Sequence, residues 1–141
     1  MAIIQKTKAS IEWETPREFF QNLDDEFYFT LDPCATEDNA KCDRYYTVVD
    51  DGLTKDWTNE VVYMNPPYGR ELQHWVAKAC KEKCTTVMLI PARTDTWWFH
   101  ELLWNQPNIE IRFLRGRKRF VGSKHNAPFP SMIVVVHNGN S

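Results

Sequence analysis

Three short apolar segments of the sequence are each stopped by proline, and this pattern restricts the fold more than any other feature. The segments cover residues 27–31, 61–64 and 87–90. Proline has no amide hydrogen for a β-ladder, so each segment is predicted to be a strand that ends close to its proline. The third segment is continuously apolar, which is typical of a strand buried on both faces of a sheet.

Segments with helical patterns precede and separate these strands. Residues 15–18 form a capping box with proline at the first helical position, so a helix is expected to run to about residue 25. Apolar side chains recur at helical spacing through 70–83, and 95–103 is expected to form another helix. Further strands are expected over 109–114, 118–121 and 132–136.

This order of elements predicts an α/β fold with a mostly parallel sheet and helices on both faces. The last strands follow one another without a helix between them, so they are expected to form an antiparallel hairpin at one edge. Ligands of open α/β sheets bind beyond the carboxyl ends of the strands. The residues that follow the first two strands, 32–34 and 65–68, are therefore expected at one rim of the sheet.

The length and composition are typical of one soluble domain. The chain has 141 residues, 43% of them hydrophobic, which suits a single domain over 1–141 with flexible tails at 1–10 and 138–141. No apolar run approaches the roughly 18 residues of a membrane helix. The polar N-terminus does not resemble a secretory signal, so the four cysteines are expected to be reduced thiols in a cytoplasm. Their spacing fits no standard zinc site, and no metal is expected.

Charge is distributed unevenly along the chain. The net charge is −2, but residues 12–60 hold fourteen acids against four basic residues, whereas 111–125 hold six basic residues and no acid. A local basic patch is typical of a protein that binds a polyanion, although a solvated loop explains the same charges. The expected DNA-binding residues are Arg93, Arg112, Arg115, Arg117, Lys118, Arg119 and Lys124.

Of Trp97 and Trp98, one is expected in the core and the other beside a bound base.

The segment Asn65-Pro66-Pro67-Tyr68 carries the clearest chemical signal. The prolines stiffen the loop, and the Asn65 side-chain oxygen and the Pro66 carbonyl can both accept hydrogen bonds from one planar amino group. The Tyr68 ring can stack on the planar system that carries this group. An amine on a heteroaromatic ring is a poor nucleophile, and two acceptors would localise charge on its nitrogen and aim it at an electrophile. A simple turn without chemistry is the alternative.

Motifs along most of the chain resemble one enzyme family in order. They are Trp13-x-Thr15-Pro16, Leu31-Asp32-Pro33-Cys34-Ala35-Thr36, Asp51-Gly52-Leu53 with Trp57, Asn65 to Gly69, Pro91 to Phe99, and Arg115 to Ser131. Together they resemble the phage-type DNA N6-adenine methyltransferases, the Dam-like family, over roughly residues 11–137. The resemblance implies a compact Rossmann-like methyltransferase fold, S-adenosylmethionine as methyl donor and adenine N6 in DNA as acceptor. It also implies a phage or prophage origin and a role in protection from restriction.

The same resemblance implies roles for individual residues. The catalytic residues would be Asn65, Pro66, Pro67 and Tyr68. The donor-binding residues would be Trp13, Thr15, Pro16, Asp32, Pro33, Cys34, Ala35, Asn65, and Asp50 or Asp51. The last two lie 18 and 19 residues after Asp32, near the usual spacing for an acid that meets a ribose, and the spacing leaves both open.

The sequence departs from common methyltransferases in two ways, and two other functions stay open. No glycine-rich turn follows the first strand, and 141 residues leave no room for a target-recognition domain, so selectivity must come from loops, a homodimer partner or nothing. The grip on a planar amine suits a protein glutamine equally well, which makes a protein methyltransferase one alternative. A degenerate nucleic-acid-binding module is the other, and donor binding would separate it from both enzymes.

Overall fold

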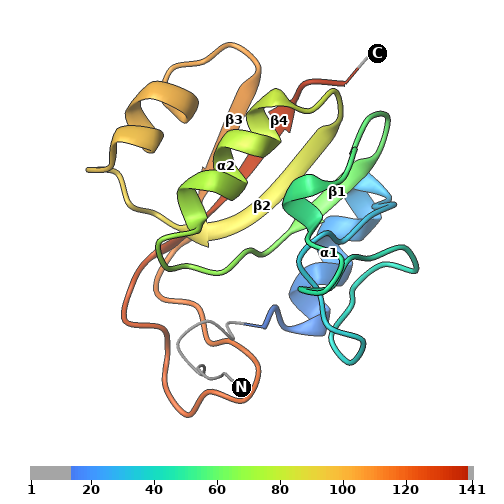
Figure 1. Ribbon diagram of the computed structural model, residues 1–141. Helices are drawn as coiled ribbons and strands as arrows, with labels where there is room; N and C mark the ends of the chain where they lie inside the picture. Colours follow the sequence, from blue (N-terminus) through green and yellow to red (C-terminus); the bar gives the residue numbers. More distant parts are fainter. Residues whose placement is uncertain (1–13, 140–141) are drawn as a thin grey trace.

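The structure is a computed structural model that describes residues 14–139 (Figure 1). Its helices are α1 (Arg17–Phe27), the 3₁₀ turn η3 (Gly52–Thr54), α2 (Leu72–Lys81) and the short π-helix η4 (Phe99–Leu103). Its strands are β1 (Val61–Met64), β2 (Thr85–Pro91), β3 (Ile109–Phe113) and β4 (Ser131–His137). Trp13 and the expected tail at 1–10 lie outside the described residues.

The four strands form one mixed sheet in the order β1-β2-β4-β3. Strand β1 pairs with β2 in parallel, while β4 is antiparallel to both β2 and β3. The expected mostly parallel sheet is therefore wrong, whereas the antiparallel hairpin at one edge, β3 with β4, is confirmed. Parallel pairing needs a long crossover, usually a helix, and the segment 114–130 that leads into β4 contains no helix.

Two of the expected strands do not form. Helix α1 extends to Phe27 and is stopped by Tyr28 in the left-handed conformation, with φ of 57°. In the segment that follows, only Leu31 and Asp32 make isolated parallel bridges, to Val62 and Tyr45. The expected strand at 118–121 is also absent, because this stretch belongs to the irregular segment 114–130. Leu31 nevertheless lies beside β1 and runs parallel to it, so Asp32 follows at the same rim as Asn65.

Side chains of the sheet alternate between two apolar cores, one on each face. Helix α2 packs over the face that presents Met64 and Met88, and α1 packs over the opposite face, with Phe20 against Tyr63 (Figure 1). The result is a sheet with a helix on either side, as the alternation of strands and helices predicts. Within residues 14–139, no helix combines the length and apolar character needed to cross a membrane.

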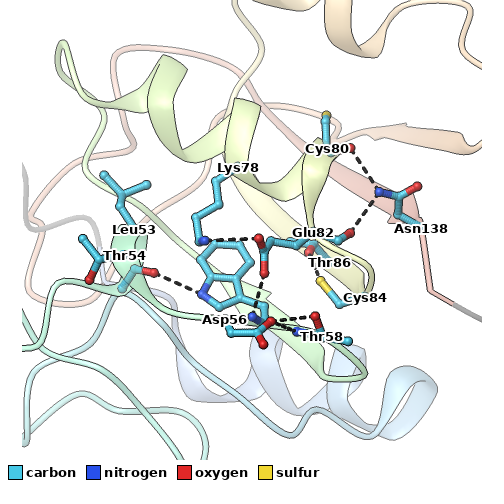
Figure 2. Close-up of polar contacts among 12 residues, drawn as sticks. Leu53, Thr54, Asp56, Thr58, Lys78, Cys80, Glu82, Cys84, Thr86 and Asn138 are labelled. Carbon is cyan, nitrogen blue, oxygen red and sulfur yellow. Dashed lines mark hydrogen bonds and ion pairs between the residues drawn. The ribbon is translucent and has the colours of Figure 1, made fainter.

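Glu82, at the end of α2, ties several segments to the sheet (Figure 2). Its carboxylate pairs with Lys78 at 3.3 Å and accepts the backbone N–H of the fully buried Trp57 at 2.7 Å. The indole N–H of Trp57 then donates to the Gly52 carbonyl at 3.1 Å. Asn138, which the sequence places in a tail, donates to the carbonyls of Cys80 and Glu82 (Figure 2). These contacts fix the loop at residues 52–57 against α2.

Candidate active site at the ends of the parallel segments

A cavity of about 390 Å³ opens where β1 and the Leu31 bridge end. Loops from distant parts of the chain meet there, which is the position expected for a ligand site in an α/β sheet. Among the residues expected to bind a donor, the cavity is lined by Thr15, Asp32, Pro33, Cys34, Ala35, Asp51 and Asn65. Pro16 and Asp50 are not part of this lining: Pro16 is the N-cap residue of α1.

Asp32 is a buried carboxylate in the cavity wall, with a side chain and backbone only 4% exposed. Its two oxygens accept the backbone N–H groups of Cys34 at 3.2 Å and Lys41 at 3.0 Å. Burial raises the pKa of Asp32 to about 6, and the two N–H donors and the Lys41 charge oppose this rise. The Lys41 ammonium pairs with Glu14 at 3.2 Å. A desolvated carboxylate in this position favours a positively charged ligand group.

The two candidate acids for a ribose occupy different surroundings. Asp50 turns back on its own loop, where its carboxylate accepts from the backbone N–H and hydroxyl of Thr47 at 3.0 and 3.2 Å. Asp51 lines the cavity, is exposed and has a left-handed backbone with φ of 59°. Its carboxylate accepts the backbone N–H of Leu53 at 3.3 Å. The structure therefore brings Asp51, and not Asp50, to the cavity.

Gly52 explains how the cavity forms without a glycine-rich turn after the first strand. A Cβ built on Gly52 would lie 2.3 Å from the Pro33 carbonyl oxygen, far inside van der Waals contact. Only glycine lets the loops at 33 and 52 approach this closely. Gly52 and Pro33 both line the cavity, so this close approach shapes its wall. The sequence shows Gly52 in a motif but gives no local sign of this contact.

The Asn65 amide is held by a chain of hydrogen bonds. Its Nδ2 donates to the Thr15 hydroxyl at 3.1 Å, and that hydroxyl lies 2.5 Å from the Tyr63 hydroxyl. Burial raises the pKa of Tyr63, so this phenol stays neutral. Thr15 therefore does not cap α1, as the expected capping box requires; it orients Asn65 instead. Tyr63 was not among the expected site residues, because a tyrosine in a buried strand carries no signal of its own.

Tyr68 supports the other end of the Asn65 amide. Its hydroxyl lies 2.6 Å from Asn65 Oδ1 and 3.1 Å from the Leu89 carbonyl, and its one proton is directed at these two acceptors. The residue is 3% exposed, and its ring meets Phe120 and Phe129 edge-on. With so little of the residue exposed, the Tyr68 ring is covered in this conformation and is not open to a base. Pro66 is buried, and Pro67 lines the cavity.

The basic residues expected to bind DNA fall into two groups. Arg112 is paired with Glu26 through two hydrogen bonds of 2.8 and 2.6 Å, and with Glu110 through one of 2.6 Å. These contacts occupy its guanidinium, so the structure sets Arg112 apart from the expected DNA-binding residues. The residues of the other group make no ion pair within the described part of the chain, and they are Arg93, Arg115, Arg117, Lys118, Arg119 and Lys124.

The segment 114–130 carries all of this second group except Arg93, and it contacts the Asn65 loop through Phe120 and Phe129, whose rings meet Tyr68. Lys118 lies over the Phe19 ring at 3.8 Å, and burial lowers its pKa. Arg119 donates to the Ser123 carbonyl at 3.1 Å. Across residues 14–139, no group of three or more metal-binding side chains comes together.

Fold and site together define a mixed α/β protein with a ligand cavity at the ends of its parallel segments and an amide-bearing Asn-Pro-Pro-Tyr loop in the cavity wall. Sequence comparison identifies this protein more closely. The profile of one family, described as DNA N-6-adenine-methyltransferase (Dam), matches residues 4–137, and the chain belongs to this family.

Two curated relatives come from bacteriophages. The chain is 34% identical over 102 residues to a DNA N-6-adenine-methyltransferase of Escherichia phage T1, and the match covers 69% of this chain and 42% of the relative. It is also 34% identical over 103 residues to a DNA N-6-adenine-methyltransferase of Haemophilus phage HP1, covering 69% and 59%. The chain thus spans about half the length of these relatives.

Proposed function

We propose that this protein transfers a methyl group from S-adenosylmethionine to the N6 amino group of adenine in DNA. The observation that carries the proposal is the Asn65 amide, fixed at the wall of the cavity by Thr15 on one side and Tyr68 on the other. Membership of the Dam family and the names of the phage relatives support the choice of adenine and DNA. We also propose that the fold is methyltransferase-like, although its four-stranded sheet is mixed and not mostly parallel.

The residues of the cavity fit the proposed donor. S-adenosylmethionine carries a positively charged sulfonium and an ammonium group, and when bound it supplies an electrophilic methyl group. Asp32 offers a buried carboxylate whose pKa is raised by burial, and a cationic ligand would stabilise its charged form. Asp51 offers an exposed carboxylate in the lining of the same cavity, which we assign to the ribose hydroxyls. Thr15, Pro33, Cys34 and Ala35 would shape the rest of the donor site.

Asn65 and Pro66 would hold the acceptor. The adenine must leave the DNA helix before its amine can reach the cavity. An amide oxygen can accept two hydrogen bonds, so Asn65 Oδ1 can take one from Tyr68 and one from the amine, and the Pro66 carbonyl can take the second N–H. These acceptors would stabilise the positive charge that develops on nitrogen as its bond to the methyl carbon forms and the bond between that carbon and the donor sulfur breaks. The donor would leave as a neutral thioether, and the surplus N–H proton would pass to water. Their fixed position also aims the nitrogen at the donor.

Tyr68 has two proposed tasks in this scheme. In the described conformation its hydroxyl orients Asn65, and its ring is covered by Phe120 and Phe129. Stacking on the flipped adenine therefore requires the side chains that cover the Tyr68 ring to move. The same segment carries Arg115, Arg117 and Lys124, whose phosphate contacts would be salt-dependent and largely independent of sequence.

The test is to identify the methylated product. Purified protein is incubated with S-adenosylmethionine carrying a labelled methyl group, together with unmethylated DNA or with a glutamine-containing peptide. The DNA is digested to nucleosides, and products are identified by mass. N6-methyladenine in the DNA sample alone is the expected result. Label in the peptide alone would support a protein-glutamine methyltransferase. A protein that neither binds the donor nor transfers methyl groups would instead be a nucleic-acid-binding module.

A further inference from the structure

A second cavity, of about 240 Å³, is lined by the segments that follow β1 and β2. Arg70 and Gln73 line it from the segment that follows the Asn-Pro-Pro-Tyr motif, and Arg93 and Trp97 line it from the segment that follows β2. Strands β1 and β2 are parallel neighbours, so both segments emerge at the same rim. The cavity therefore opens close to the place where the target amine is proposed to be held.

Trp97 presents a fixed aromatic surface in this cavity. The residue is 51% exposed, whereas its neighbour Trp98 is 5% exposed and belongs to the core. The indole N–H of Trp97 donates to Gln73 Oε1 at 3.0 Å. This bond satisfies the only polar atom of the side chain and restricts the rotation of the ring. An exposed indole held in one orientation is suited to stack on a flat partner without a large loss of side-chain entropy.

The charges around Trp97 favour a polyanion. Arg70 and Arg93 are exposed, and neither makes an ion pair among residues 14–139. Among the described residues, no acidic side chain lines the cavity. Arg112 shows the contrasting situation, because its guanidinium is neutralised by two glutamates. A flat ring flanked by two unpaired guanidinium groups matches a nucleotide, which joins a π-face to a phosphate.

We propose that Trp97 stacks on a base of the DNA strand adjacent to the target adenine, while Arg70 and Arg93 bind the phosphates of the same strand. This inference rests on the proposed function, since it places DNA at the rim. Extrusion of one adenine leaves its neighbour without a stacking partner on one side. The indole of Trp97 would replace that partner and lower the cost of extrusion. Because every base has a π-face, the contact would tolerate different neighbouring sequences.

The test measures DNA affinity by fluorescence anisotropy, with a labelled single-stranded oligonucleotide and a labelled duplex that carries one mismatched adenine. Trp97→Ala is expected to raise Kd by about 5- to 150-fold, the range for loss of one base–aromatic stack, and Trp97→Phe to restore most of the affinity. Trp104→Ala is the matched control, because Trp104 is similarly exposed at 54% but lies outside this cavity. Its Kd should equal that of the unmodified protein.

Salt titrations test the arginines separately. Arg70→Ala and Arg93→Ala should each reduce the slope of log K against log salt by about one. Trp97→Ala with unchanged affinity, or with a loss equal to that of Trp104→Ala, would overturn the stacking site. Failure of the proposed function looks different: no variant, nor the unmodified protein, would methylate DNA, while Trp97→Ala would still weaken DNA binding. An unmodified protein that binds no DNA would overturn both proposals.

Discussion

Burial of Asp32 should make the stability of the protein depend on pH in a direction opposite to that of ordinary surface carboxylates. The pKa of Asp32 rises from 3.8 to about 6 on folding, chiefly because burial removes water from the carboxylate. The folded protein therefore holds this proton more tightly than the unfolded chain. Its contribution to stability is complete below about pH 4 and is lost as the pH rises through 6.

The magnitude follows from the size of the shift. One pKa unit corresponds to 1.36 kcal/mol, so a rise of roughly two units predicts a total loss of about 3 kcal/mol, of which about 2 kcal/mol falls between pH 4 and pH 7. Other carboxylates titrate over the same range, so the comparison must be made against Asp32→Asn, which has no charge to lose. In this variant the side-chain NH₂ group faces a backbone N–H of Cys34 or Lys41, so two donors meet and one hydrogen bond is lost. This loss of stability does not change with pH.

The assay is urea denaturation of both proteins at about pH 4, 5, 6 and 7. The free energy of unfolding of the unmodified protein, minus that of Asp32→Asn, should fall by about 2 kcal/mol over this range. Asp56→Asn is the control of opposite sign: Thr58 donates hydrogen bonds to Asp56 and lowers its pKa, so its contribution is lost as the pH falls. A difference for Asp32 that is constant with pH, or that grows with pH, would refute the reasoning.

Three other substitutions test separate contacts. Tyr63→Phe removes the hydroxyl that meets Thr15, so it should lower the free energy of unfolding by about 1 kcal/mol. It should also lower kcat several-fold without changing KM for DNA. An unchanged kcat would refute the positioning role of Tyr63. Gly52→Ala forces a Cβ against the Pro33 carbonyl, so donor affinity measured by calorimetry should fall about tenfold, and an unchanged titration would contradict the proposed donor site. Arg112→Ala should cost about 0.5–1 kcal/mol of stability in urea and leave the salt slope of DNA binding unchanged, whereas a smaller slope would show a phosphate contact.

Local sequence patterns predicted most elements of the fold but not the sheet. Helical spacing located α2, and continuous apolar runs located β2 and β4, because these patterns reflect which side chains are buried. The order and direction of the strands depend on pairing between distant segments. A continuous apolar run is compatible with a parallel or an antiparallel central strand, so it does not predict which of the two forms. The segment 27–31 was predicted to be a strand from its alternation, yet helix α1 continues to Phe27 and uses part of it.

The candidate site was predictable only where residues follow strands directly. Asp32 and Asn65 both do, and the structure places both in the wall of one cavity. The roles of Tyr63 and Gly52 in the site were not predicted, because they depend on contacts with residues that are distant in the sequence. Arg112 was expected to bind DNA because its neighbours are basic, but its partner Glu26 lies 86 residues away in the sequence. Local charge therefore does not reveal which cations are already paired.

The measurement that tests the central claim most directly is the single-turnover rate of adenine methylation with saturating donor and DNA. Asn65→Ala removes the acceptor that is proposed to hold the amine, and the rate should fall by about 10²- to 10³-fold, the usual effect of losing one group that stabilises transition-state charge. Gln106→Ala is the control, since Gln106 is an exposed amide outside the cavity lining. The account predicts a large loss for the first variant and none for the second. A rate for Asn65→Ala within about threefold of the unmodified protein would contradict it.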